Sequence, residues 1–521
     1  MGYTHRQFVW RVLREGALRR LANSLLVVVS VLLVTALAEG ATRLIDGLPL
    51  FADWLPSMVD RDVPAMVVDS IPRAPGVARD IFFEDPPPLP NRRAPPAEWV
   101  RIARELGEKT EFGRPLFHHA DFFKAWNEMA IGNPCDSAVL RQAPGRLFVY
   151  TPADGARYPL YRFLPDATTP LGLVTNRMGW RGPPIDLAKP ARVVRIAFIG
   201  ASTTVNSHFY PFSYPELVGG WLNRWAAARS LDVRFEVINA GRESISSPDI
   251  EAIVRGELLP FRPDLVVYYE GANQFFLSTM LTSLPAGDPV RPGGNVEEGP
   301  LSRWLRDASQ HSALARRLQS ALGLVGHPGN GGEWPKPDYT LLWPNGLDEG
   351  DPDIARADLP VNLSAIIADL DRIRADLKGI DAELVMSSFK WLVHDGMVAD
   401  PVRDRSLIEH LNVGKFPFRY RDLERMAAFQ NRVFAKYAAA HGLAFIDVAG
   451  RMPEDRRLYT DAVHFSYGGV RLHAWIDLQA LVPLIEQRLA SGKWPRPAEA
   501  PADVPRGLFF TPNEIAVRCG P

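Results

Sequence analysis

The chain has 521 residues, enough for two or three domains or for one large domain with insertions. Hydrophobic residues make up 46% and charged residues 23% of it, proportions of a folded protein that exclude wholesale disorder. The 59 basic and 60 acidic residues give a formal net charge of -1, so composition provides no reason to expect a nucleic acid as a partner.

The N-terminus combines a basic segment with an apolar one. Residues 1–20 contain five arginines and one acidic residue, and Leu21 to Ala38 contains no charge. We expect residues 1–20 to be cytoplasmic and residues 21–41 to form a transmembrane helix. The positive-inside rule then predicts a single-pass protein of the bacterial inner membrane, with the rest of the chain in the periplasm or outside. Ala36-Leu37-Ala38 also fits a signal-peptidase site, so a cleaved signal is the alternative, with the same destination.

Two proline-rich stretches flank the middle of the chain. Residues 45–185 show no sustained period and are predicted to be irregular, with short helices at 97–106 and 121–129. Residues 491–521 are expected to form a proline-rich C-terminal tail.

The two cysteines, Cys135 and Cys519, lie one in each of these stretches. Two isolated cysteines cannot form a four-ligand zinc site, and no other residue pattern suggests a metal or a cofactor. In an oxidising compartment paired thiols persist as a disulfide, so we expect a Cys135–Cys519 bond that ties the tail to the N-terminal region. Two unrelated thiols are the alternative.

Residues 190–490 alternate between strand-like and helix-like patterns. Strands are expected near 193–199, 235–238, 265–269, 384–386 and 443–447, and helices near 214–228, 248–257, 363–377, 422–441 and 468–489. This alternation predicts a three-layer α/β/α sandwich with a parallel sheet, whose functional residues lie just beyond the carboxyl ends of the strands. Residues 278–360, with a helical piece at 301–322, break the pattern and are interpreted as an insertion that forms a lid or selects substrate.

Three of these strand ends carry residues suited to catalysis. Ser202 follows the first strand in Ile199-Gly200-Ala201-Ser202, on a tight turn before a helix N-terminus. Gly241 and Asn273 follow the next two strands. Each of these segments alone is more typical of an ordinary turn.

Asp461 and His464 lie three residues apart before the last helix. A serine hydroxyl needs a base to take its proton, and imidazole has a suitable pKa near neutrality. The imidazole in turn needs a carboxylate to fix its tautomer and orientation. His464 can therefore act as the base and Asp461 as its partner, with His394 as the rival base.

The order Ser202, Gly241, Asn273 and Asp461-x-x-His464 resembles the four blocks of the SGNH (GDSL-like) hydrolase family over residues 190–490. The resemblance implies a flavodoxin-like parallel sheet, a Ser202 nucleophile assisted by His464 and Asp461, and an oxyanion hole made by the Ser202 and Gly241 N–H groups with Asn273. It implies neither metal nor cofactor.

Other short segments refine the resemblance. The segment 176–182 is similar to a leader in membrane-anchored bacterial members. Three residues depart from the family pattern, because Ala201 and Gln274 stand where aspartate is common and Arg242 is bulky for its place beside the oxyanion hole.

The expected activity is therefore that of a serine esterase on acyl esters, of the O-acetyl type, through an acyl-serine intermediate. The ester substrate is a small molecule or a polysaccharide. An O-acyltransferase that modifies a cell-envelope polysaccharide with the same residues is the alternative. A catalytically silent envelope-assembly or binding protein is the second alternative, although a binding module has no chemical need for this set of residues.

Overall fold

A computed structural model of the protein describes residues 5–45, 50, 63–89, 97, 101, 110–111, 114–115, 128–136, 146–151, 159, 161–168, 173–206, 210–290, 312–322, 331–399, 404–504, 508 and 513–516. The chain forms two compact units. The first contains residues 1–56 and 292–328, and the second contains residues 57–291 and 329–521.

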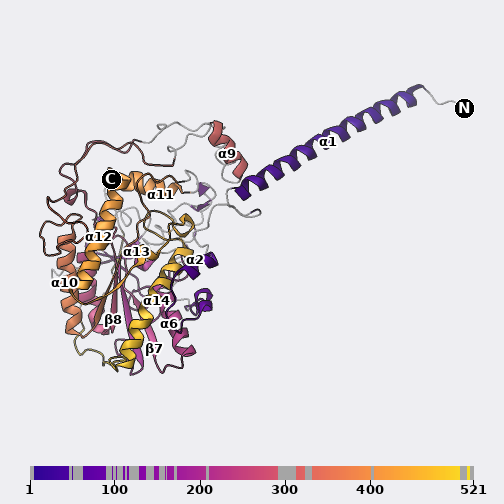
Figure 1. The fold of residues 1–521 in the computed structure, drawn as a ribbon. Helices are drawn as coiled ribbons and strands as arrows, with labels where there is room; N and C mark the ends of the chain where they lie inside the picture. Colours follow the sequence, from indigo (N-terminus) through magenta and orange to yellow (C-terminus); the bar gives the residue numbers. More distant parts are fainter. Residues whose placement is uncertain are drawn as a thin grey trace. The chain divides into compact units, whose positions relative to one another are not determined.

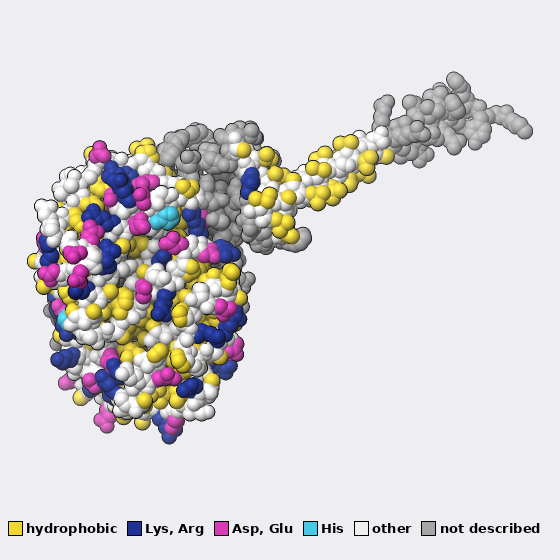
Figure 2. Space-filling view, in the orientation of Figure 1, with side chains coloured by type: hydrophobic (Ala, Val, Ile, Leu, Met, Phe, Trp, Pro, Cys, Tyr) yellow, Lys and Arg dark blue, Asp and Glu magenta, His cyan; other side chains and the backbone are white. Residues whose placement is uncertain are grey.

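The first unit is built on a long N-terminal helix, α1 (His5–Ile45). Its part Ala22–Ile45 is 24 residues long and apolar, which is sufficient to cross a membrane and equally compatible with a signal sequence. Hydrophobic side chains are exposed along this part of the helix (Figure 2). The predicted span 21–41 thus lies within one continuous helix.

Near its C-terminal end, α1 contacts a helix of the insertion, α9 (Ala313–Leu322). The Glu39 carboxylate accepts hydrogen bonds from the Ser312 hydroxyl at 2.8 Å and from the Ala313 and Leu314 N–H groups at 3.0 Å each. A carboxylate at a helix N-terminus satisfies N–H groups that have no partner within the helix. Part of the insertion therefore returns to the N-terminal helix.

The second unit contains a five-stranded parallel sheet, which confirms the predicted α/β architecture. Its strands are β6 (Val193–Gly200), β7 (Arg234–Asn239), β8 (Leu265–Tyr269), β9 (Glu383–Ser387) and β10 (Ala444–Ile446). Their spatial order is β10-β9-β8-β6-β7, and every pairing is parallel. All residues of β6 and β8 are buried, as expected for strands covered on both faces. Numbered from the first strand, this is the doubly wound order 2-1-3-4-5.

Helices cover both faces of this sheet (Figure 1). They are α6 (Tyr214–Ala228), α7 (Ser247–Ile253), α10 (Leu363–Gly379), α12 (Tyr420–Ala440) and α14 (Tyr467–Ala490). The connection from β6 to β7 runs in the opposite direction to those from β7 to β8 and onward, so right-handed crossovers put α6 on one face and α7 and α10 on the other. Accordingly α6 packs against α14, whereas α10 packs against α7 and α12.

Shorter elements complete the second unit. The helical ones are α2 (Ala65–Ser70), η1 (Arg79–Phe83), η2 (Pro134–Asp136), α5 (Ser202–Val205), η4 (Val254–Leu258), η5 (Leu259–Phe261), η6 (Leu277–Thr279), α11 (Arg405–Glu409), η7 (His410–Gly414), α13 (Val448–Arg451) and η8 (Arg456–Leu458). The helix expected over 248–257 ends earlier, because α7 passes into the π-helical turn η4 after Ile253.

The flanking regions contain more regular structure than expected. A four-stranded sheet has the order β11-β4-β3-β5, made from β3 (Glu128–Ile131), β4 (Arg146–Tyr150), β5 (Tyr161–Phe163) and β11 (Asn513–Ala516). A two-stranded sheet joins β1 (Thr110–Glu111) to β2 (Arg114–Pro115). The prediction of an irregular region over 45–185 is therefore wrong in part, because strands of two to five residues are too short to show a period.

The structure differs from two predictions, the short helix over 121–129 and the separate C-terminal tail. Glu128 and Met129 begin β3 instead of ending a helix over 121–129, and most of the residues of both short predicted helices lie outside the described part of the chain. The tail is not a separate extension, since β11 pairs antiparallel with β4. Cys135 lies in η2, close after β3, but Cys519 is outside the described residues and their disulfide stays a prediction.

The second half of the insertion, residues 331–360, packs against η7, the segment that follows it and α12. The backbone N–H of Trp334 donates to Asn412 Oδ1 at 2.8 Å, and the ring of Tyr339 meets that of Phe418 edge to face. The rings of Trp343 and Phe429, the latter from α12, are also packed edge to face. Residues 331–360 are therefore part of the folded body of this unit.

Candidate active site

Ser202 lies at the edge where the strand order of the sheet changes direction. It is the first residue of α5, directly after β6, and it is partly exposed. The turn requires glycine at Gly200, because a Cβ there would lie 2.1 Å from the carbonyl oxygen of Tyr269 and 2.2 Å from the Thr204 hydroxyl. That hydroxyl donates to the same carbonyl at 3.1 Å and holds the turn against β8. Ligands of doubly wound sheets bind at this position, between the first and third strands.

The structure brings Ser202, His464 and Asp461 together in one hydrogen-bonded line. The Ser202 Oγ lies 2.8 Å from His464 Nε2, and His464 Nδ1 lies 2.7 Å from Asp461 Oδ2. The other carboxylate oxygen, Oδ1, accepts the N–H groups of Val463 at 2.8 Å and His464 at 2.9 Å. The imidazole therefore carries its proton on Nδ1, and Nε2 is left to accept the serine proton.

The charges in this line are strongly coupled. Burial alone would raise the pKa of the Asp461 carboxyl, but the charges and hydrogen bonds of His464 and His410 hold that pKa well below its usual range. Burial alone would lower the pKa of His464, but the charge and hydrogen bond of Asp461 raise it above the ordinary imidazole value. The carboxylate thus stays ionised while the imidazole gains basicity.

A buried arginine supports the segment that carries His464. Arg181 lies in the segment 176–182, noted above from sequence, and its guanidinium pairs with Glu216 at 2.8 Å and donates to the carbonyl of Tyr210 at 2.5 Å. The Tyr210 hydroxyl donates to the carbonyl of Phe465 at 2.7 Å, one residue beyond His464. This segment therefore positions the active-site turn through buried polar contacts and contributes no group to the Ser202 line.

Asn273 lies in the loop after β8, and a hydrogen bond fixes the orientation of its side-chain amide. Asn273 Nδ2 donates one hydrogen to the carbonyl of Ile245 at 3.0 Å, which leaves the second hydrogen available. The loop is fixed by Glu270, whose Oε1 accepts the N–H groups of Ala272 at 2.9 Å and Asn273 at 2.8 Å. Burial raises the pKa of Glu270 to about 7, although these hydrogen bonds act in the other direction.

Gly241 also lies at the site, in a space too small for a side chain. A Cβ at this residue would lie 2.7 Å from the backbone nitrogen of Val205, so only glycine fits. Its N–H already donates to Asn239 Oδ1 at 3.1 Å, so an oxyanion would have to share this hydrogen. The bulk of Arg242 is directed away, because its guanidinium is buried against Glu257.

The structure adds a histidine that the sequence patterns did not indicate. His410 Nδ1 lies 3.2 Å from Asp461 Oδ1, so the carboxylate contacts two imidazoles. His410 begins η7, a π-helical turn, and π-turns are frequent at functional sites. No spacing relates His410 to Asp461, which lies about fifty residues further along the chain. The rival base His394 contacts the carbonyl of Asp395 at 2.9 Å, and no hydrogen bond joins it to Ser202 in the described part of the chain.

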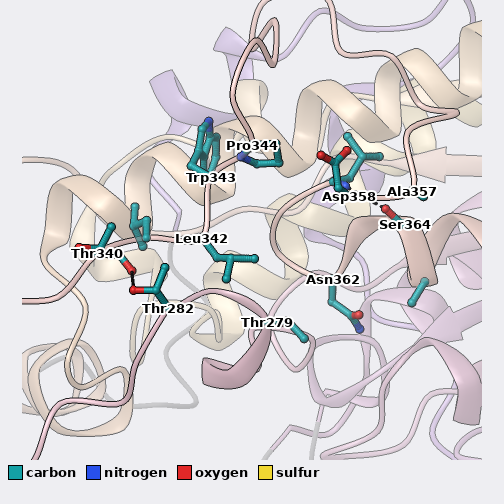
Figure 3. Close-up of a pocket in the computed structure, with 13 residues that line it drawn as sticks. Thr279, Thr282, Thr340, Leu342, Trp343, Pro344, Ala357, Asp358, Asn362 and Ser364 are labelled. Atoms are coloured by element: carbon teal, nitrogen blue, oxygen red, sulfur yellow. Dashed lines mark hydrogen bonds between the residues drawn. The ribbon is translucent and has the colours of Figure 1, made fainter.

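A separate cavity of about 710 Å³ lies elsewhere in the second unit (Figure 3). Its lining comes from residues 279–282, 340–344 and 357–365, and includes none of the Ser202 line. Within the described residues, no group of three or more His, Cys, Asp or Glu side chains is arranged to hold a metal ion.

Several solved esterase structures align with part of this chain at low identity and low TM-score. A lipase/acylhydrolase from Enterococcus faecalis is 16% identical, with a TM-score of 0.29, covering 59% of this chain and 100% of its own. The acetyl xylan esterase AlAXEase is 13% identical, with a TM-score of 0.30 and coverages of 56% and 100%. A catalytic mutant of an acetylxylan esterase from Geobacillus stearothermophilus is 14% identical, with a TM-score of 0.30 and coverages of 56% and 96%.

No protein-family model matches the chain, and no curated protein matches it. Because the TM-scores lie below 0.5, the description of the fold depends on the strand order and helix packing given above.

The ionisation of His464 provides a direct test of this geometry. In the full-length protein, NMR titration of labelled histidines should show His464 taking up its proton above about pH 6.5, the usual imidazole value. In Asp461→Asn the titration should move to lower pH than in the wild type, because the charge and hydrogen bond that oppose burial most strongly are lost. Titration of His464 at the same pH in both proteins would contradict the coupling.

Proposed function

We propose that the protein is a serine esterase that hydrolyses acyl esters of the O-acetyl type. The observation that carries the proposal is the unbroken line from Ser202 Oγ through His464 to Asp461, with links of 2.8 and 2.7 Å. This is the arrangement that activates a serine hydroxyl at neutral pH. It lies at the carboxyl edge of a parallel sheet, on a serine that solvent can reach.

In the first half-reaction the Ser202 oxygen attacks the ester carbonyl carbon while its proton passes to His464 Nε2. The carbonyl oxygen becomes an oxyanion, and the positive imidazolium is stabilised by Asp461. The tetrahedral intermediate then collapses, the bond to the alcohol oxygen breaks, and the imidazolium gives its proton to the leaving alcohol. Water repeats these steps on the acyl-serine, which releases the carboxylic acid and regenerates the hydroxyl.

The oxyanion in this mechanism is stabilised mainly by two donors. The Ser202 N–H begins α5 and points from a helix N-terminus, and Asn273 retains one amide hydrogen beyond its bond to Ile245. The Gly241 N–H contributes as a shared donor, because Asn239 already accepts it.

The destination of the acyl group is tested by supplying a competing acceptor. Full-length protein in detergent is incubated with nitrophenyl acetate, with and without an acceptor oligosaccharide. Hydrolysis that is unaffected by the acceptor supports the esterase. Transfer of acetyl to the sugar would show that the protein is an O-acyltransferase that uses the same acyl-serine. If neither hydrolysis nor transfer occurs, a catalytically silent binding protein is favoured.

The Ser202→Ala variant should lose turnover and keep its fold, because removing one hydroxyl at the turn disturbs little packing. A fluorophosphonate probe should label the wild-type protein at Ser202 and leave the variant unlabelled, as read by mass spectrometry. His464→Ala should lose activity nearly as completely, whereas the matched variant His394→Ala should stay close to wild type. Labelling at another serine would overturn the assignment.

The Asn273→Ala variant should reduce kcat by about 10²- to 10³-fold with little change in KM, since an oxyanion donor acts mainly in the transition state. The neighbouring amide Gln274 bonds Tyr268 instead, so Gln274→Met is the control and should keep most of kcat. Thermal unfolding of both variants checks their stability. A change confined to KM would show that Asn273 binds ground-state substrate.

We further propose that α1 anchors the protein in the inner membrane, with the esterase on the periplasmic side. This rests on the exposed apolar part of α1 and on the five arginines that precede it. It also predicts the Cys135–Cys519 disulfide, and the pairing of β11 with β4 supports this bond by bringing the end of the chain to the sheet that contains β3.

Thiol counting on denatured, unreduced protein should therefore find no free thiol per chain, and two after reduction. The cross-link would close a loop of most of the chain, for which chain-entropy estimates give about 5 kcal/mol at most. Two free thiols before reduction would contradict both the disulfide and the exported location.

A further inference from the structure

The Asp461 carboxylate receives more donors than one catalytic imidazole requires. Among the described residues, Oδ2 accepts the His464 Nδ1 hydrogen alone, whereas Oδ1 accepts two backbone N–H groups and lies 3.2 Å from His410 Nδ1. The side chains of Asp461 and His410 are 19% and 17% exposed. A mostly buried carboxylate therefore lies between two imidazoles from distant parts of the chain.

His410 is held firmly on its own side of this contact. The Lys415 N–H donates to the carbonyl of His410 at 2.9 Å and closes the π-helical turn. The imidazole lies 6.3 Å from the ring of Trp391, over which Lys415 Nζ also lies, at 5.2 Å. Both imidazoles face Asp461 with Nδ1, so each can donate an Nδ1 hydrogen to the carboxylate.

We propose that His410 is a positioning residue of this site, which shares the Asp461 carboxylate with His464 and thereby sets its orientation and the basicity of His464. The proposal rests on the esterase function proposed above. In the part of the chain that the structure describes, no hydrogen bond joins His410 to Ser202 or Asn273, so its action passes through Asp461.

The carboxylate orientation is the first effect. Oδ1 is bonded to the N–H groups of Val463 and His464, which belong to the same turn as Asp461. His410 adds a donor from outside that turn. With Oδ1 held by three donors, Oδ2 is directed at His464 Nδ1. Without the His410 donor, the carboxylate is held only by groups of its own turn, residues 461–464.

The basicity of His464 is the second effect. A hydrogen bond to Oδ1 withdraws part of the negative charge that raises the proton affinity of His464, and a charged His410 would withdraw more. The presence of His410 beside Oδ1 therefore weakens the effect of Asp461 on His464. The other charged groups around them are Lys415 and Glu270, which act on Asp461 and on His464 respectively, and Glu243, which also acts on His464.

Two substitutions separate the donor from the charge. In His410→Asn the amide nitrogen stands close to the place of Nδ1, so a donor remains but cannot ionise. In His410→Leu both the donor and the ionisable group are lost at similar bulk. His394→Leu is the matched control, because within the described residues no hydrogen bond or ion pair joins His394 to Asp461 or Ser202, and its ring contacts the Asp395 carbonyl instead.

Kinetics of full-length protein on nitrophenyl acetate should separate the variants. His410→Leu should lower kcat by about 10- to 100-fold with KM unchanged, the size expected for one hydrogen bond to a charged group. His410→Asn should keep kcat within about threefold of wild type, since the donor is retained. In both, the rise of kcat/KM with pH should move its midpoint to higher pH, further in Leu than in Asn.

Three results would overturn the proposal. The first is a wild-type kcat in His410→Leu, and the second is an equal loss in Asn and Leu when both unfold at the wild-type temperature. The third is a pH profile unchanged in both variants, because a merely structural histidine would leave it unmoved.

Failure of the esterase proposal would be seen separately, as a wild-type protein without turnover. In that case the ionisation of His464 still tests whether His410 acts on it through Asp461. It is followed by NMR in Ser202→Ala, alone and combined with His410→Asn or His410→Leu. The pH at which His464 takes up its proton should be lowest in Ser202→Ala, higher when His410→Asn is added, and highest when His410→Leu is added. An equal value in all three proteins would overturn the inference.

Discussion

The candidate active site depends on one short turn in which the Asp461 side chain bonds the backbone of the residues that follow it. Asp461 Oδ1 accepts the N–H groups of Val463 and His464, so the carboxylate and the imidazole are fixed relative to each other within four residues. The sheet then has only to bring a serine to Nε2. That task falls to the turn after β6, where Gly200 allows the close approach of β8 and Thr204 fastens the two together.

The same turn explains why buried charge is tolerated at this edge of the sheet. An isolated carboxylate would lose much of its hydration there, and the usual outcome is protonation. Asp461 remains ionised because both of its oxygens are satisfied by donors, two of them imidazoles. Glu270 shows the intermediate case, since backbone N–H groups occupy one oxygen, while burial still raises its pKa to about 7.

Features encoded by local sequence were predictable, and features made by distant contacts were not. The strands of the central sheet, Ser202 at a strand end and the Asp461–His464 spacing all follow from patterns a few residues long. The pairing of β11 with β4 joins segments more than 350 residues apart, and neither strand is long enough to show alternation. His410 reaches Asp461 only through a π-turn, which has no sequence pattern of its own. The direction of the Arg242 side chain was equally hidden, because it depends on Glu257.

Environment, not residue type, separates His464 from a second histidine nine residues further along. His473 is fully buried on α14 between the rings of Tyr214 and Tyr269, and neither of its nitrogens has a hydrogen-bond partner among the described residues. Its nearest carboxyl, Asp477, lies 3.7 Å away and is itself desolvated, so burial raises the pKa of Asp477 and lowers that of His473 to about 3. With its pKa lowered to about 3, His473 is too weak a base to take a proton near pH 7. His464 differs by one well-placed carboxylate at 2.7 Å, held ionised by its own turn, and that difference reverses the direction of the pKa shift.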